Sequence, residues 1–174
     1  MIRVAIACET AGPQTSSEPG SGDVVTSLLD EGAPAEGDPV YIAGCMLYWG
    51  EGWKCRGSVQ LSNSDPEVIR FFARFLRECF GVPDERMRIV CHLFADHVKR
   101  QCEIERFWLD VAGLPRSCLR KSMVNHYSRS SQRKRLNRLP NGTCKLIVNS
   151  TEILQTIYGS IQELGGFIRP EWLD

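Results

Sequence analysis

The sequence predicts an α+β fold in which helices pack on one face of a mixed or antiparallel sheet. Segments that alternate apolar and polar residues are typical of strands with one buried face, and they occur at 57–62, 86–93 and 143–149. Residues 119–127 can form a further strand. Segments with apolar residues at helical spacing separate these strands. A sheet covered by helices on one side leaves its other face in water.

The chain has 174 residues, of which 43% are hydrophobic and 24% are charged. We expect one folded domain over 38–167, an acidic leader at 1–37 and a short tail at 168–174. Residues 10–39 are rich in Gly, Pro, Ser and acidic residues, a composition that cannot bury enough apolar surface to fold. No apolar run is long enough to span a membrane, and the N-terminus is a poor signal peptide, so we expect a cytoplasmic protein.

The first helix is predicted to begin at Asp38 and Pro39, a capping carboxylate followed by proline at the first helical position. Residues 40–49 are apolar almost all round, which predicts that this helix is buried. Two glycines end it, and Glu51 lies between them. The helix dipole disfavours a carboxylate at this end, so Glu51 needs a positive partner such as Mg²⁺. Glu51 could also be an ordinary loop carboxylate.

Three amphipathic helices are predicted in the rest of the chain. One begins at the Asp65–Pro66 cap and buries Val68, Ile69, Phe72, Phe75, Leu76 and Cys79. A second spans 101–112 and turns Ile104, Phe107, Trp108 and Val111 inward. The last begins near Ser150 and buries Ile153, Leu154, Ile157, Tyr158, Ile161 and Leu164.

The outer faces of the predicted strands are polar and basic. They carry Gln60, Arg86, Arg88, His92, Lys145 and Asn149. A basic loop before the last strand adds Arg129, Arg133, Lys134, Arg135 and Arg138. Residues 116–145 hold nine basic and no acidic side chains, whereas 1–40 hold one basic and seven acidic ones. Such side chains contact phosphates and base edges, so we expect binding to double-stranded DNA.

Eight cysteines are scattered along the chain without close pairs. We interpret them as reduced thiols, because disulfide frameworks are typical of small secreted domains. A zinc site built from Cys91, His92, Asp96, His97 and Cys102 is disfavoured for the same lack of a closely spaced cysteine pair.

The order of these motifs resembles a LAGLIDADG-type homing endonuclease domain over roughly residues 39–165. The resemblance is carried by the GEG helix end at 50–52, SNSDP at 62–66 and LPNGTCKLIVN at 139–149, with FW, GLP and LRK between them. The combination of YWGEG with SNSDP is similar to a bacterial group that has a degenerate form of this domain.

The resemblance implies a saddle-shaped sheet on the major groove of DNA and a homodimer packed through the motif helix. Its interface would use Ala43, Met46, Leu47 and Gly50. Glu51 would be the metal-binding carboxylate of the motif, a catalytic residue that holds Mg²⁺ at the scissile phosphate. Gln60 and Lys121 are further catalytic candidates by position. Met46 and Glu51 depart from the family's usual small residue and Asp.

The expected function is therefore metal-dependent endonuclease cleavage of double-stranded DNA by a homodimer. One alternative is a catalytically inactive regulator that keeps the same fold and binds DNA without metal. Another is a protein-interaction domain whose basic loop is incidental.

Overall fold

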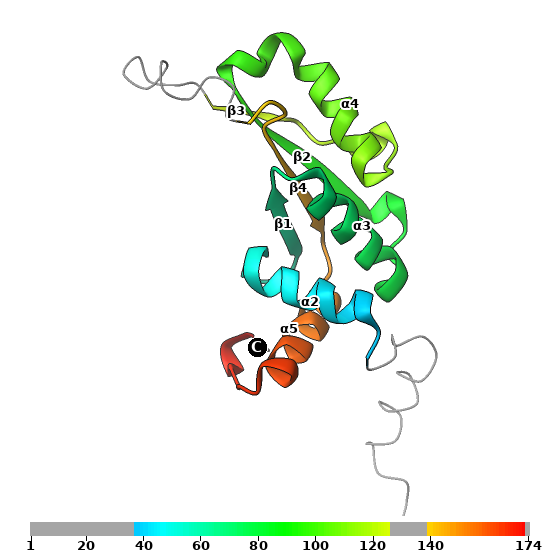
Figure 1. Ribbon diagram of the computed structural model, residues 1–174, viewed down its shortest axis with the longest axis vertical. Coiled ribbons are helices and arrows are strands. Elements are labelled where there is room, and N and C mark those ends of the chain that lie inside the picture. Colours follow the sequence, from blue (N-terminus) through cyan, green and yellow to red (C-terminus); the bar gives the residue numbers. More distant parts are fainter. Residues whose placement is uncertain (1–36, 126–138, 173–174) are drawn as a thin grey trace, which may run out of the picture. The chain divides into compact units, whose positions relative to one another are not determined.

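The computed structural model describes residues 37–125 and 139–172, which form an α+β fold (Figure 1). Its main elements are α2 (Pro39–Glu51), β1 (Val59–Asn63), α3 (Pro66–Phe80), β2 (Met87–Phe94), α4 (Gln101–Ala112), β3 (Met123–Asn125), β4 (Thr143–Val148) and α5 (Thr151–Gly165). Short 3₁₀ turns are η1 (Asp84–Arg86), η2 (Ala95–Arg100), η3 (Arg116–Cys118) and η4 (Pro170–Trp172). The α+β prediction is confirmed. The acidic leader and residues 126–138 of the basic loop lie outside the described residues.

The four strands form one mixed sheet in the order β1-β4-β2-β3. β4 pairs antiparallel with both β1 and β2, whereas β2 and β3 are parallel. Leu146 of β4 lies opposite Leu61 on one side and Ile89 on the other. The strand nearest the C-terminus of the chain therefore occupies the interior of the sheet.

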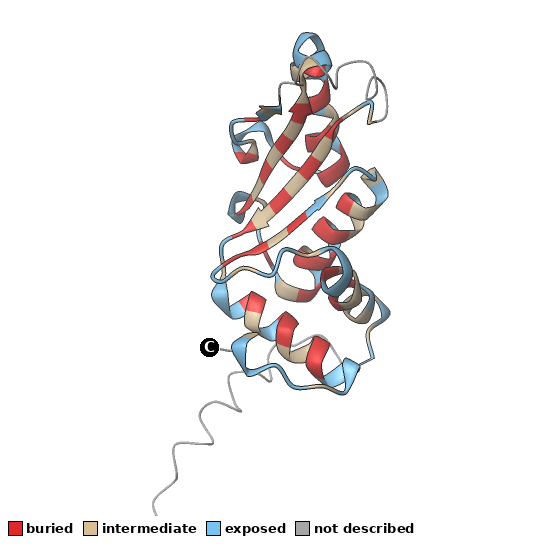
Figure 2. Cartoon of the chain, turned by 90° about the vertical axis from the view of Figure 1, so that its left-hand side faces the viewer, coloured by how far each residue is buried: buried red, intermediate tan, exposed pale blue. Residues whose placement is uncertain are grey.

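The two faces of the sheet differ in burial, as the alternating sequence pattern predicts. The side chains of one face are fully buried: Val59, Leu61, Met87, Ile89, Cys91, Leu93, Cys144, Leu146 and Val148. The residues between them are half-buried or exposed, and Figure 2 shows this alternation along the strands. The buried face forms the core, and the other face is left open.

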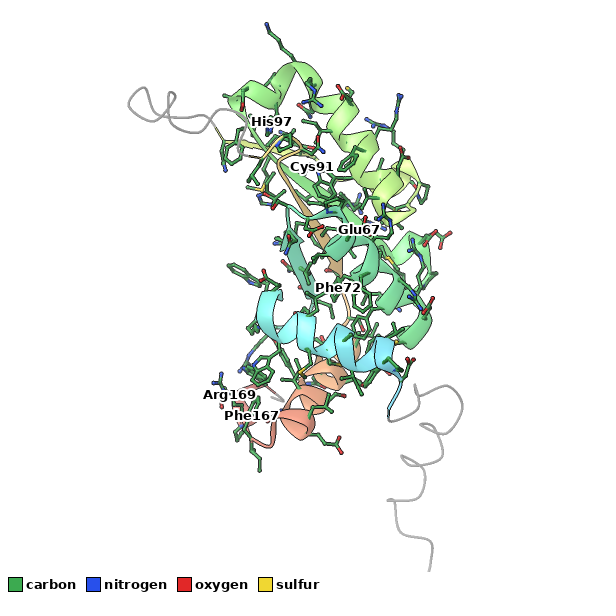
Figure 3. All side chains as sticks on the ribbon, in the orientation of Figure 1. Glu67, Phe72, Cys91, His97, Phe167 and Arg169 are labelled. Carbon is green, nitrogen blue, oxygen red and sulfur yellow. The ribbon has the colours of Figure 1, made fainter. Side chains whose placement is uncertain are left out.

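The helices supply the other half of the core. α3 contacts β1 and β4, and α4 contacts β2. Phe72 of α3 and Trp108 of α4 are both fully buried, and Figure 3 labels Phe72. The Trp108 indole donates to the Asn141 carbonyl at 2.8 Å, so this large ring satisfies its one polar group. α2 packs against α3 and α5.

The helix boundaries confirm the predicted caps. The carboxylates of Asp38 and Asp65 accept hydrogen bonds from Val40 and Glu67, and each is followed by proline in the first turn. The Ser150 hydroxyl accepts from the Ile153 amide at the start of α5. These side chains satisfy amide donors that have no partner inside the helix.

Three details of the sequence prediction are wrong. α2 is not buried all round, because only one side of it meets the rest of the chain. Leu164 is 49% exposed, since it lies in the last turn of α5 beyond the core. Residues 119–122 are not part of β3: Leu119 makes one isolated bridge to Ile89, after the η3 turn has redirected the chain.

All seven cysteines in the described part of the chain are free thiols. Five of them are buried, Cys55 is half-buried and Cys102 is exposed. Burial raises the pKa of Cys91 to about 11 and that of Cys45 to about 12, so neither thiol ionises near neutral pH. No helix in the described residues is both long enough and apolar enough to cross a bilayer.

Candidate nucleic-acid interface

The open face of the sheet mixes polar and apolar side chains, and its strands carry no negative charge. Its residues, in strand register, are Gln60 and Ser62 on β1, Ile147, Lys145 and Thr143 on β4, Arg88, Val90, His92 and Phe94 on β2, and Met123 and Asn125 on β3. None of the four strands contains an aspartate or glutamate. The charges within the strands, from Arg88 and Lys145, therefore favour a polyanion.

The basic groups on this face differ in how freely they can reach a ligand. The Arg88 guanidinium donates to the Met87 carbonyl at 2.7 Å and also to the Glu85 carbonyl, so it is folded back along the backbone. The Lys145 ammonium lies 5.7 Å from the centroid of the Trp53 ring. Lys145 therefore projects toward the β1 edge of the face, where it meets an aromatic side chain.

His92 lies near the other end of the open face, between Thr143 of β4 and Met123 of β3. Its Nε2 atom is buried and has no hydrogen-bond partner in the described residues. Burial and, next, the Lys145 charge lower the pKa of His92 below its ordinary value. The ring is therefore neutral at pH 7 and can accept or donate a hydrogen bond.

The motif helix α2 has one buried and one outward face. Gly44, Cys45 and Tyr48 are buried. A Cβ added at Gly44 would lie 2.1 Å from the Phe75 ring, so glycine is needed for α2 to approach α3 this closely. The small residues of the helix thus serve a contact inside the chain.

The predicted interface residues lie on the outward face of α2. Ala43 and Gly50 are exposed, and Met46 and Leu47 are half-buried. A Cβ built at Gly50 has no neighbour within 4 Å, so the space beside it is open. No charged side chain occurs between Pro39 and Gly50. Met46 and Leu47 pack in part against the core of the same chain, so each of them is only partly open to a second molecule.

The end of α2 runs directly into the sheet. Gly52 caps the helix and forms an antiparallel bridge with Leu61 of β1. A side chain at Gly52 would collide with the Tyr48 ring and carbonyl, at 2.4 and 2.5 Å. The structure therefore brings the exposed Glu51 close to β1, where Gln60 faces outward. The Gln60 amide donates to the Ser58 hydroxyl at 2.6 Å.

Lys54 supplies positive charge at the C-terminus of α2. Its ammonium donates to the carbonyls of Tyr48, Trp49 and Gly52 at 2.9, 2.5 and 2.8 Å. Burial lowers the pKa of Lys54, and the nearby Glu51 charge opposes this shift. Glu51 itself forms no ion pair with another described residue. The positive partner that the helix end requires is thus provided by the chain.

The other predicted site residues are not among the groups that the described structure brings to Glu51. Lys121 is exposed and lies two residues before β3, which is separated from β1 by β2 and β4. Arg86 belongs to the η1 turn instead of a strand and donates to the Asn149 carbonyl at 3.4 Å. The predicted loop contacts Arg129, Arg133, Lys134, Arg135 and Arg138 lie outside the described residues. Glu51 and Gln60 are brought together, and Lys121 is not brought to them.

Two residues beside Glu51 were missed in the sequence analysis. Trp53 is 64% exposed at the edge of the open face, and Lys54 caps α2. A cation shortly after a helix end is a recognised C-terminal signal, so Lys54 could have been identified. Trp53 is a large aromatic residue between a helix-ending glycine and a polar-faced strand, and nothing in the hydrophobic periodicity marks it.

The next question is whether the described residues offer the ligands that a Mg²⁺ ion needs. The described residues contain no group of three or more His, Cys, Asp or Glu side chains that could hold a metal ion. One chain supplies one carboxylate at the helix end, and Mg²⁺ is commonly held by one or two carboxylates together with phosphate oxygens. Glu51 fits such a site when a second Glu51 and a DNA phosphate complete it.

The chain was compared with family models, with curated proteins and with solved structures, and none of these comparisons gives a match. The LAGLIDADG resemblance therefore stays a prediction carried by the sequence motifs.

Proposed function

We propose that this protein binds double-stranded DNA through the open face of its sheet and cleaves it as a homodimer with Mg²⁺. The observation that carries the proposal is the position of Glu51, which is exposed at the end of α2 and directly precedes Gly52, the residue that bridges to the edge strand β1. A metal bound there would stabilise charge on the oxygens of a scissile phosphate.

DNA binding is supported by the shape and charge of the sheet. A β-sheet face can enter the major groove, where side-chain donors and acceptors read base edges. Gln60 and Lys145 supply such groups from the adjacent strands β1 and β4, and Arg88 and His92 of β2 lie on the same face. A face without carboxylates also avoids repulsion of the phosphates.

Dimerisation is supported by the outward face of α2. One chain offers one Glu51, and a two-fold axis along α2 would bring two of these carboxylates to the centre of the site. C₂ symmetry would also favour a near-palindromic DNA target. The open space beside Gly50 permits close approach of a second helix.

Lys54 favours a second candidate function, a DNA-binding regulator that does not cleave. Its ammonium already neutralises the carbonyl end of α2 through its contacts with backbone oxygens. A fixed positive charge beside Glu51 weakens the attraction of that carboxylate for a metal ion. The regulator would bind duplex DNA equally well without Mg²⁺.

The two candidates are separated by a cleavage assay on a randomised duplex library with and without Mg²⁺. The variant is Glu51→Gln, and the control is Glu163→Gln, which changes an exposed glutamate on α5. We expect cleavage by the wild type and by Glu163→Gln, and at least a ~100-fold lower rate for Glu51→Gln. Equal cleavage by all three proteins would contradict a role for Glu51. Binding without cleavage by any of them would favour the regulator.

A further inference from the structure

Trp53 is the most exposed tryptophan in the described chain, and its backbone is firmly held. Its ring is 64% exposed, compared with 41% for Trp49 and complete burial for Trp108. The Trp53 amide donates to the Gln60 carbonyl, and its carbonyl accepts from the Tyr48 hydroxyl, both at 2.8 Å. A ring that contributes little to the core is thus held at a fixed place at the edge of the sheet.

The other aromatic residues of this half of the molecule are engaged with one another. Trp49 lies 5.3 Å from Phe167, and Tyr158 stacks on Trp172 at 4.7 Å, measured between ring centroids. Arg169 lies over the Phe167 ring, and Figure 3 shows both residues beyond the end of α5. No ring pair among the described residues includes Trp53, whose polar neighbour is the Lys145 ammonium.

An aromatic ring beside an ammonium matches the two parts of a nucleotide. The Lys145 ammonium lies over one face of the Trp53 ring. A base would stack on the other face, and the ammonium offers a counter-charge for a phosphate. The strands beside Trp53 carry no carboxylate, so the surroundings favour an anionic ligand over an acidic or neutral protein surface.

We propose that Trp53 and Lys145 form a nucleotide subsite in which the indole stacks on a base displaced from the DNA duplex. This inference rests on the proposed DNA-binding function and specifies what the DNA does at the site. In an intact duplex each base is already stacked on its neighbours, so a ring from the protein can stack only where a step opens or a base leaves the helix.

The subsite lies where such an opening would serve the proposed reaction. Trp53 follows Glu51 by two residues, and both flank the Gly52–Leu61 bridge. Stacking there would hold the DNA backbone open beside the carboxylate. The cost of displacing a base is smallest when that base is mismatched, so the protein prefers DNA that carries unpaired bases.

The test compares a fluorescein-labelled duplex with the same duplex carrying central T·T mismatches, by fluorescence anisotropy at low ionic strength. The full chain is used as wild type, Trp53→Leu, Trp53→Phe and Trp49→Leu. We expect the wild type to bind the mismatched DNA about tenfold more tightly, since one stacked base contributes at this level. Trp53→Leu loses this preference, Trp53→Phe retains most of it, and Trp49→Leu keeps it in full.

The outcomes separate this inference from the proposed function. Binding of both DNAs by the wild type with equal affinity overturns the subsite and leaves duplex binding intact. A mismatch preference that survives in Trp53→Leu also overturns the subsite, provided that circular dichroism shows that the variant is folded. If the wild type binds neither DNA, the proposed function fails and the subsite fails with it.

Discussion

At the scale of single residues, Glu105 shows how a polar group can be buried in a well-packed core. This α4 carboxylate is 5% exposed. Its Oε1 accepts hydrogen bonds from Gln101 at 2.8 Å and from the Ser122 hydroxyl at 2.7 Å. The Arg116 guanidinium lies 3.6 Å from Oε2. These contacts connect α4 to the segment that leads into β3, which holds the short edge strand in place.

Replacement of Glu105 by Ala should lower the free energy of unfolding by about 2–3 kcal/mol, because Gln101 and Ser122 lose a buried acceptor. The matched control is Glu103→Ala on the same helix. Glu103 is exposed and pairs with Arg100 at the surface, so its loss should cost about 0.5 kcal/mol or less. Urea unfolding monitored by circular dichroism measures both changes. Equal losses for the two variants would contradict a structural role for Glu105.

His92 should make stability depend on pH below neutrality. Its pKa in the folded protein is lowered by burial and by Lys145, so the unfolded chain binds more protons between that value and about 6.5. The contribution of the neutral ring is therefore complete above pH 6.5 and is lost as the pH falls through this window.

The check is urea unfolding of the wild type and of His92→Gln at pH 7.5, 6.5 and 5.5. The wild type should lose more stability on acidification than the variant, which has no titrating group at this place. Parallel pH profiles for the two proteins would show that His92 does not titrate differently in the folded state.

At the scale of elements, α2 shows where sequence patterns are sufficient and where they are not. Its start at Asp38–Pro39 and its end at Gly52 follow from local capping chemistry, which needs no tertiary contact. The side of α2 that is buried cannot be predicted from the sequence. The helix is apolar almost all round, so no pattern distinguishes the side that packs against the rest of the chain. The structure assigns Gly44, Cys45 and Tyr48 to the inside, leaves Ala43 and Gly50 exposed, and places Met46 half-buried between the two sides.

The outward face of α2 leads to a prediction about assembly. Met46→Lys places a charge in the middle of the proposed dimer interface, where burial of an unpaired ammonium is strongly unfavourable. We expect the wild type to be dimeric and Met46→Lys to dissociate with at least a ~100-fold higher Kd. Light scattering across a concentration series measures this.

The control for the assembly experiment is Val98→Lys, which changes another exposed apolar residue, on the η2 turn. It should remain dimeric, and thermal melting should show both variants folded. A monomeric wild type, or a dimer that tolerates Met46→Lys, would remove α2 as the interface.

At the scale of the whole molecule, the sheet could be predicted in outline because its strands have a one-sided burial pattern. Each end of β2 and β4 lies within one residue of its predicted position. The prediction succeeds because alternate residues, such as Ile89 and Leu146, must face the core. β3 could not be delimited, because its three residues are held by pairing with β2 and by the Ser122–Glu105 bond instead of by any pattern of their own. Strand order also depends on long-range pairing.

Only part of the candidate site could be predicted from the sequence, for a similar reason. Glu51 and Gln60 are marked by the helix end and by strand alternation. The residue type of Lys121 and its position in the chain suggest that it belongs with Glu51 and Gln60. The strand order β1-β4-β2-β3 instead places Lys121 near the edge of the sheet opposite β1. Lys54 is marked by its place just after a helix end, whereas Trp53 can be recognised only when the helix end and the sheet are seen together.

The central claim, that the open sheet face binds duplex DNA, is tested most directly by the salt dependence of binding. Affinity for a fluorescein-labelled duplex is measured across a KCl series for the wild type, for Lys145→Gln on the open face, and for Arg106→Gln. Arg106 is exposed on α4, the helix that packs against the buried side of the sheet. The wild-type affinity should fall steeply with salt, and Lys145→Gln should reduce the slope of log K against log salt by about one. Arg106→Gln should leave the slope unchanged. A wild-type affinity that does not depend on salt, or equal slopes for wild type and Lys145→Gln, would contradict the assignment of this face.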